Sequence, residues 1–381
     1  MLRFVLDAFW DDGLWLPPNT TWEDIAPGPE KAVVYTDYRH LIFPIPLAFV
    51  LILLRNLLEK YWFAPFGKSL GIKNTRAKKA SNNPQLEAAY QKSSKIKHKQ
   101  LFLCKNKVAA LAKQLDLSER QVERWLRLRR SQDKPSTLVK FCENLWRCTF
   151  YLYNFSFGLF VLWDKVWLWD IDNCYVGYPH HGVTNDVWWY YMVSSAFYWS
   201  LTISQFWDVR RKDFWQMFIH HIAAIALLNF SWVCNLHRIG TLVLLSHDCA
   251  DIVLEAAKAA KYANYQKLCD VLFAVFTIMW IATRLGVYPF YIIWSTLIRA
   301  PMLLPMFPAY HIFNSLLCLL LALHLVWTWL ILQVAYKTIT SGQMEGDIRS
   351  SSSEISDSSN DPSNHSSPHR GDHNNVHKKE T

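Results

Sequence analysis

Long apolar runs recur along this chain of 381 residues and leave little choice of fold. A helix needs about 20 residues to cross the hydrocarbon of a bilayer, because it rises about 1.5 Å per residue. Hydrophobic residues make up 51% of the sequence, and 19 Trp is a high number for a soluble protein. We therefore expect an all-α multi-pass membrane protein. The candidate spans are 41–63, 139–163, 187–207, 214–234, 239–260, 267–293 and 309–336.

Charged residues interrupt two of these runs. The first contains Arg55 as well as Pro44, and the second begins with Glu143 and Arg147. Seven spans is the preferred count, with six or eight left open.

Basic residues predict the orientation of the chain in the membrane. The segment 67–140 contains 19 Lys or Arg against five acidic residues, a net charge of +14, whereas the whole chain carries +9. Positive loops favour the cytosolic side. We expect a lumenal segment at 1–40, a cytosolic domain at 67–134, and a cytosolic C-terminus.

Three short motifs bear on this topology. Asn19 begins the glycosylation sequence Asn-Thr-Thr, which is used on the lumenal side. Lys378 and Lys379 have the spacing of a di-lysine retrieval signal of the endoplasmic reticulum, and a solvated Lys pair is the alternative. The tail 341–381 is rich in Ser, Asn and Asp and is expected to be disordered. Within it, acids follow Ser351 and Ser353 in the pattern of acid-directed kinases.

The eight cysteines have no zinc-type spacing. Cys174 and Cys234 would both lie on or near the lumenal side, so a disulfide between them is left open. The others are expected to be small apolar fillers.

Residues 84–130 are expected to form a small helical unit, with Ser118 as the N-cap of its last helix. That helix resembles a homeodomain recognition helix, although Leu128 replaces the asparagine that contacts adenine. A structural or regulatory module is favoured over sequence-specific DNA binding, and basic residues here are able to bind phosphate or lipid headgroups. The matching positions are Gln121, Val122, Trp125, Arg129 and Arg130.

Ionisable residues stand in the middle of two neighbouring apolar runs, where they are costly and usually functional. One run holds His220 and His221, and the next holds His247, Asp248 and Asp251. Counted from the adjoining basic residues, His220 lies about 12 Å deep, Asp251 about 10 Å and Asp248 about 15 Å. The two clusters are therefore expected to meet in one chamber. A His backed by a carboxylate suits general-base or nucleophilic catalysis, while metal binding and a purely structural or transport role stay open.

The segment 205–256 resembles the Lag motif of the ceramide synthases, from Gln205-Phe-Trp-Asp-Val-Arg-Arg-Lys-Asp-Phe214 through the His pair to the Asp pair. The similarity extends over most of 1–340. It includes Phe197-Tyr198-Trp199-Ser200, Lys134-Pro135-Ser136 and Phe141-Cys-Glu.

The resemblance implies an N-acyltransferase of the endoplasmic reticulum membrane that joins a fatty acyl-CoA to a sphingoid base. Its fold would be a TLC domain at 138–340, a barrel of six helices preceded by one further span. Acyl-CoA enters as co-substrate, and neither a metal nor another cofactor is expected. Membrane lipids and a homo- or heterodimer are further partners. The alternatives are a lipid sensor or transporter on the same fold, and a regulatory or DNA-binding role for the homeobox-like segment.

The resemblance also implies roles for residues. His220, His221, Asp248 and Asp251 would be catalytic, with His220 either the base for the amine or the nucleophile that forms an acyl-imidazole. The loop between the last two spans, around Ile298–Pro308, would influence the choice of acyl chain. The residues expected to contact substrate are His247, Arg210, Arg211, Lys212, Tyr198 and Trp199.

Overall fold

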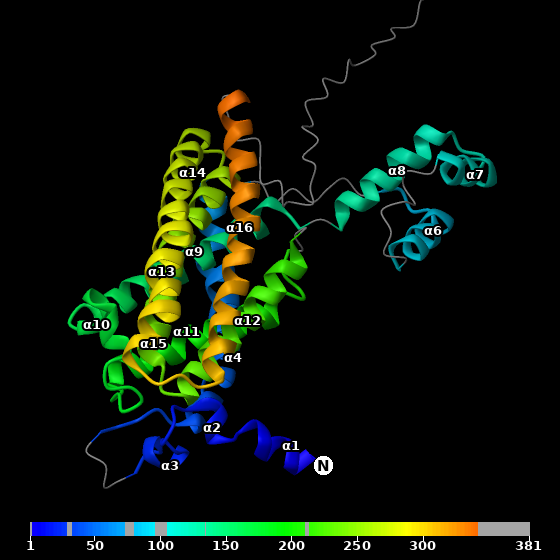
Figure 1. Ribbon diagram of the computed structural model, residues 1–381. Coiled ribbons are helices and arrows are strands. Elements are labelled where there is room, and N and C mark those ends of the chain that lie inside the picture. The colour runs from blue at the N-terminus through cyan, green and yellow to red at the C-terminus, as the bar shows by residue number, and fades with distance from the viewer. Residues whose placement is uncertain are drawn as a thin grey trace, which may run out of the picture.

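The computed structural model describes residues 2–28, 33–72, 80–95, 105–133, 135–209 and 213–341. Within these ranges the regular elements are all helices (Figure 1). An all-α protein is therefore confirmed for the described part of the chain.

The chain passes along one helical bundle seven times, at the positions of the seven apolar runs. Successive passes alternate in direction, as expected for short connections between antiparallel helices. The passes are α4 (Pro44–Leu58) continued by η2 (Glu59–Phe63) and α5 (Ala64–Ser69), α9 (Thr137–Leu162), α11 (Asn185–Ser204), α12 (Phe214–Val233), α13 (His237–Tyr262), α14 (Gln266–Trp280) continued by η5 (Ile281–Ile293), η6 (Ser295–Arg299) and α15 (Ala300–Leu303), and α16 (Ala309–Ser341).

Four of these passes are long and apolar enough to cross a membrane: 38–69, 214–233, 266–303 and 309–340. The other three, α9, α11 and α13, carry more polar side chains, many of which point into the bundle. Glu143, Asn154 and Asp248, for example, are all buried. A multi-pass membrane protein is supported, and the full count of seven spans stays a prediction.

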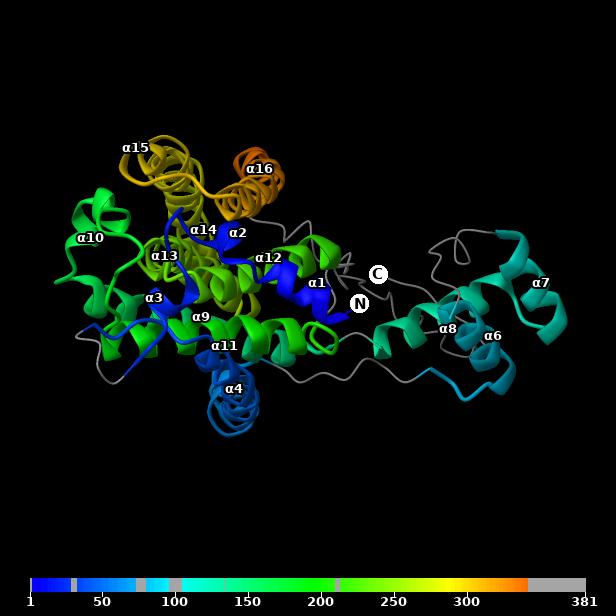
Figure 2. The ribbon, with the colours of Figure 1, turned by 60° about the horizontal axis from the view of Figure 1, so that its bottom comes forward.

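Six of the passes close into a ring. The contacts run from α9 to α11, α12, α16, the α14–η5 helix, α13 and back to α9. The remaining pass, α4, packs outside this ring against α11 and α9, as the view in Figure 2 shows. The ring is what brings α12, α13 and α16 around a common interior.

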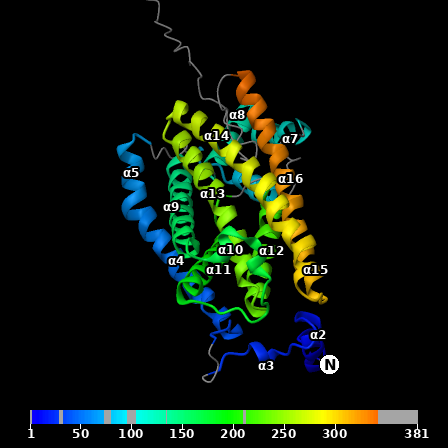
Figure 3. The same ribbon diagram turned by 60° about the vertical axis from the view of Figure 1, so that its left-hand side comes forward.

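Short helices gather at the end of the bundle where α4 begins, which we call the α2 end (Figure 3). The opposite end, where α5 finishes, is called the α5 end. Trp15 at the α2 end is fully buried and belongs to the largest apolar core together with Leu16. The short helices are α1 (Leu2–Phe9), α2 (Asp12–Trp15), α3 (Trp22–Ile25), η1 (Tyr38–Ile42), α10 (Val166–Trp169) and η4 (Ile171–Cys174).

Two expectations at the α2 end need correction. The segment 298–308 is not a loop throughout, because α15 continues the helix to Leu303. Pro301 lies in the first turn of α15, and the helix continues through it although proline has no backbone N–H to donate. The disulfide that was left open between Cys174 and Cys234 is not formed, since both are buried free thiols.

Among the described residues 84–95 and 105–132, three helices pack together: α6 (Pro84–Lys95), α7 (Lys105–Leu115) and α8 (Glu119–Gln132). Ser118 caps α8 as predicted: its backbone N–H donates to Gln121 Oε1 at 2.9 Å, and Gln121 N–H donates to Ser118 Oγ at 3.3 Å. Arg129 hydrogen-bonds Glu87 and thereby lowers the pKa of that carboxyl group. The buried core consists of Leu86, Val108, Ala112, Val122, Trp125 and Leu126. The resemblance of this helical unit to a homeobox stays a prediction, and so does DNA binding by the unit.

Candidate active site

A polar cavity opens inside the ring toward the α5 end. His220 and His221 from α12 and His247 and Asp251 from α13 all line it, so the predicted meeting of the two clusters takes place. Cationic groups line it as well. The other polar lining residues are Arg147, Tyr151, Tyr198, Gln205, Asp208, Asp213, Glu255, Lys258, Arg284 and His324.

A second, apolar cavity continues from the same point toward the α2 end. His220, His247 and Tyr198 line both cavities and therefore mark the junction between them. The walls of the apolar cavity come mainly from α12, α13 and α16, with Leu304 and Phe307 from the segment between α15 and α16. They include Ala224, Leu227, Leu228, Val243, Leu244, Leu304, Phe307, Phe313, Leu317 and Leu320.

The tautomer of His247 is set by its own helix. Its Nδ1 lies 2.7 Å from the carbonyl oxygen of Val243, which only accepts, so Nδ1 carries the hydrogen. The other ring nitrogen, Nε2, is left with a lone pair and has no partner. Because His247 lines both cavities, this buried nitrogen is available to a ligand that enters them.

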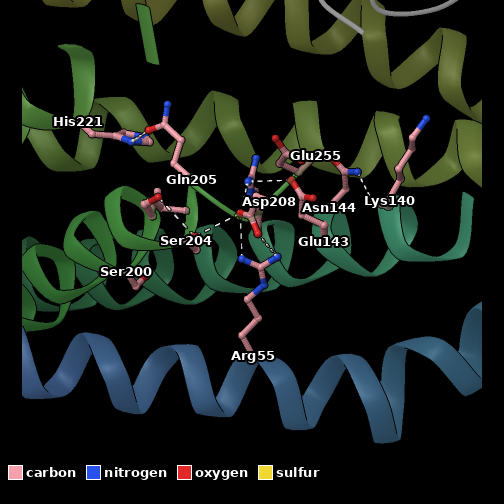
Figure 4. Close-up of polar contacts among 12 residues, drawn as sticks. Arg55, Lys140, Glu143, Asn144, Ser200, Ser204, Gln205, Asp208, His221 and Glu255 are labelled. Atoms are coloured by element: carbon pink, nitrogen blue, oxygen red, sulfur yellow. Dashed lines mark hydrogen bonds and ion pairs between the residues drawn. The ribbon is translucent and has the colours of Figure 1, made fainter. Parts of the chain in front are cut away.

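His221 is held in a similar way by Gln205. The side-chain amide of Gln205 donates to the backbone oxygen of Phe214 at 2.7 Å, which turns its oxygen toward His221. That oxygen lies 3.1 Å from His221 Nδ1, so Nδ1 is the donor (Figure 4). The neighbouring His220 packs its ring against Trp327 at 5.4 Å, and its buried Nδ1 has no partner. Both histidines face the polar cavity, but His220 alone of the pair reaches the apolar one.

The two aspartates are separated. Asp251 lies in the polar cavity wall and accepts from Arg284 at 3.2 Å. Asp248, in contrast, is not among the lining residues of either cavity. It is 2% exposed and accepts from Asn154 of α9 at 2.5 Å. The expectation that Asp248 lies in the chamber is therefore wrong, because its position on α13 turns it toward α9.

Sequence reasoning missed two residues of this site. Arg284 of η5 donates to the carbonyl oxygens of Ser246 and His247, at 2.9 and 2.6 Å, and so supports α13 next to Asp251. His324 of α16 is 1% exposed, lies against His247 with ring centroids 5.0 Å apart, and has no partner for Nδ1. The sequence could have indicated both residues, since Arg284 and His324 are ionisable residues within apolar runs.

An ionic network at the edge of the polar cavity joins α4, α9 and the segment after α11 (Figure 4). Asp208 accepts two hydrogen bonds from Arg55, at 3.0 and 2.8 Å, and one from Arg147 at 3.0 Å. Burial raises the pKa of Asp208, but Arg147 and Arg55 outweigh it and hold that pKa below its ordinary value. Glu59 and Glu143 pair with the same two arginines at 2.7 and 2.8 Å. The charges that interrupted the apolar runs thus neutralise one another.

The other predicted site residues are placed as follows. Trp199 lines neither of these two cavities and packs against the largest apolar core, so its contact with substrate stays a prediction. Asn19 is exposed at the α2 end, with a positive φ of 66°. Several residues lie outside the described ranges, namely Arg210, Arg211, Lys212, Ser351, Ser353, Lys378 and Lys379. Among described residues, no group of three or more His, Cys, Asp or Glu has the arrangement of a metal site.

Comparisons with known proteins agree with this architecture. The TRAM_LAG1_CLN8 family model, a TLC domain, matches residues 140–333, which covers the ring from α9 to α16. Human ceramide synthase 5 is 40% identical over 351 residues, covering 91% of this chain and 88% of the relative. Human ceramide synthase 4 is 40% identical over 94% of this chain and 89% of its own length. Ceramide synthase hyl-1 of Caenorhabditis elegans is 34% identical over 91% of this chain and 84% of its own.

Proposed function

This chain belongs to the ceramide synthase family, and from that premise we propose that it acylates the amine of a sphingoid base with a fatty acyl-CoA. The observation that carries the proposal is the junction at His220 and His247, where an apolar cavity meets a polar one. An acyl chain needs the apolar cavity, while its thioester and the attacking amine need the polar one. The enzyme is therefore a sphingoid base N-acyltransferase.

The cavities suggest where each part of the substrates lies. The acyl chain occupies the apolar cavity and leaves its carbonyl beside His220. The anionic CoA stays toward the α5 end, where the basic residues Arg210 to Lys212 lie in sequence between the cavity-lining residues Val209 and Asp213. Acyl-CoA is a co-substrate in this proposal, and no other cofactor takes part.

The reaction needs a base. A primary alkylamine has a pKa of about 10.4, so only about one molecule in 10³ is uncharged at neutral pH. In the covalent route, an imidazole nitrogen of His220 attacks the thioester carbonyl, the C–S bond breaks, and CoA leaves as a thiolate that takes up a proton. The amine then attacks the acyl-imidazole, the C–N bond to His220 breaks, and the amine proton passes to a ring nitrogen. In the direct route His220 only removes the amine proton.

The neighbouring residues take supporting roles. His247, whose Nε2 carries the lone pair, binds the amine or receives its proton. Asp251, paired with Arg284, places a carboxylate on the same wall of the polar cavity as His247. His221, held by Gln205, keeps α12 oriented at the cavity edge. Asp248 acts through Asn154 by joining α13 to α9 rather than by touching substrate. Tyr198 contributes to substrate contact at the junction.

We further propose the topology. Seven spans place the α2 end in the lumen and the α5 end in the cytosol of the endoplasmic reticulum. Exposure of Asn19 supports glycosylation at the lumenal end. Phosphorylation at Ser351 and Ser353, and retrieval through Lys378 and Lys379, belong to the same proposal and depend on a cytosolic tail.

An acylation assay on the purified protein tests this function. Sphinganine and a series of acyl-CoAs should yield N-acylated product, and His220→Ala should abolish synthesis. His311→Ala is the matched control, because His311 is exposed on α16 outside both cavities. A protein that binds acyl-CoA but forms no product would instead support the lipid sensor or transporter.

Intact-mass analysis after incubation with acyl-CoA alone separates the two routes. The covalent route predicts a protein heavier by one acyl group, lost on addition of sphinganine. Absence of the adduct under conditions of proven turnover would favour direct attack.

A further inference from the structure

The floor of the apolar cavity lies against the amino-terminal segment. Phe313 of α16 and Phe307 line the cavity near its α2 end. Behind Phe313 lies Trp15 of α2, with ring centroids 6.5 Å apart and the rings edge to face. Trp15 also stacks on Phe230 of α12 at 4.8 Å. Trp15 therefore contacts both α12 and α16 at the α2 end of the cavity.

Trp15 is held firmly in this position. It is fully buried, and its indole N–H donates to the backbone oxygen of Phe9 at 2.5 Å. Phe9 and Trp10 pack their rings on it at 5.3 and 5.7 Å. Because its indole N–H is hydrogen-bonded and its ring is enclosed, the Trp15 side chain forms a fixed surface behind Phe313.

The depth of the cavity follows from helix geometry. Ten residues separate His220 from Phe230 on α12, and eleven separate His324 from Phe313 on α16. At 1.5 Å per residue these helices give about 15 and 16.5 Å from the histidines to the level at which Trp15 contacts both helices, which we take as the cavity floor. An extended residue of three bonds spans about 3.6 Å, so a chain advances roughly 1.2 Å per bond. About 13 bonds, or about 14 carbons, fill that distance.

We propose that Trp15, through Phe313, closes the acyl cavity and makes this enzyme select acyl groups of about 14 to 16 carbons. The inference rests on the proposed function and assigns a specificity role to the amino-terminal segment. Acyl chains of 20 or more carbons exceed the depth by about six bonds, or roughly 7 Å, and have to displace Phe313 and Trp15. Phe313 contacts the chain end, and Trp15 acts by holding Phe313 in place.

The test measures chain-length profiles of the purified full-length protein with acyl-CoAs from 12 to 24 carbons. One readout is thermal stabilisation by acyl-CoA alone, and the other is the rate of product formation with sphinganine. Wild type should peak at about 14 to 16 carbons in both. Trp15→Ala should move both profiles two to four carbons longer. Each methylene newly buried is worth about fourfold, so the ratio of 18-carbon to 14-carbon activity should rise at least tenfold.

Two further variants keep the test decisive. Phe313→Leu shortens the floor residue from within the cavity and should shift the profile in the same direction even if Trp15→Ala does not fold. Trp163→Ala removes an exposed tryptophan at the same end of the bundle and should leave the profile unchanged. Unshifted profiles in Phe313→Leu and Trp15→Ala, with product still formed, would overturn the floor assignment and leave the acyltransferase intact. Shifted stabilisation without any product would support the floor and refute the acyltransferase.

Discussion

Replacing Asp208 by Asn should destabilise the protein through a defined set of lost contacts. The carboxylate accepts from Arg55 twice and from Arg147 once, and its side chain is 6% exposed. Asn has the same shape but no charge, and it turns an N–H₂ group toward a guanidinium. Asp208→Asn therefore removes the attraction and adds a donor where only acceptors fit.

The size of the loss follows from the remaining partners. Removing one member of a buried ion pair costs about 3–5 kcal/mol, because the other charge stays buried without compensation. Here Arg55 keeps Glu59 and Arg147 keeps Glu143, so both cations retain a carboxylate. We therefore expect a loss below that range, about 2–3 kcal/mol in the free energy of unfolding. At 2–4 °C per kcal/mol, the melting temperature should fall by about 4–12 °C.

Tryptophan fluorescence during heating of the purified full-length protein measures this shift. Asp164→Asn is the matched control, because Asp164 pairs with Lys165 at 3.1 Å but is 72% exposed. Exposed pairs contribute about 1 kcal/mol or less, so the control should melt within a few degrees of wild type. Equal melting temperatures for Asp208→Asn and Asp164→Asn would refute the view that the network holds the segment after α11 to α4 and α9.

Three further predictions concern single residues. His324→Ala should lower kcat at least tenfold, whereas His324→Asn, which can still hydrogen-bond, should recover part of it; equal rates for both variants would make His324 a packing residue only. Gln205→Leu should lower acyl transfer about 5- to 150-fold, because the buried His221 N–H loses its acceptor at about 1–3 kcal/mol, and Gln205→Glu, which keeps the acceptor but loses the donor to Phe214, should recover only part of it. His181 concerns pH. Burial lowers its pKa to about 4 from 6.5, so the unfolded chain binds this proton more readily. Stability is then complete above about pH 6.5 and falls by up to about 3 kcal/mol toward pH 4, a slope that His181→Asn should remove from melting temperatures measured across that range.

The fold was largely predictable from the sequence, since all seven apolar runs are helical, although the sixth helix continues to Leu303, ten residues beyond its expected end. Hydropathy alone was less informative for α9, α11 and α13, whose polar residues face a partner helix or a cavity rather than lipid. Arg55 and Arg147 are the clearest cases. In the sequence these two arginines only interrupt apolar runs. Their common partner, Asp208, lies far from Arg55 along the chain, so the pairing could not be predicted.

The site was predictable only in part, because helical spacing does not specify which face meets a cavity. His247 and Asp251 share a face and line the chamber, but Asp248 lies 100° around the helix from His247 and meets α9. His324 and Arg284 belong to helices distant in sequence from the motif at 205–256. Only closure of the ring brings them to it.

The pairing of Arg55 with Asp208 has a consequence for biosynthesis. These partners are 153 residues apart, so at about 5–20 residues per second the ribosome completes Arg55 roughly 8–30 s before Asp208. During that interval Arg55 has Glu59 as its nearby acid, and the cost of inserting an unpaired arginine, about 2.5–3.5 kcal/mol at the centre of a spanning helix, is an upper limit for this position. The six-helix ring can capture α4 only after Asp208 has been made, so the first helix to enter the membrane is among the last to be fixed.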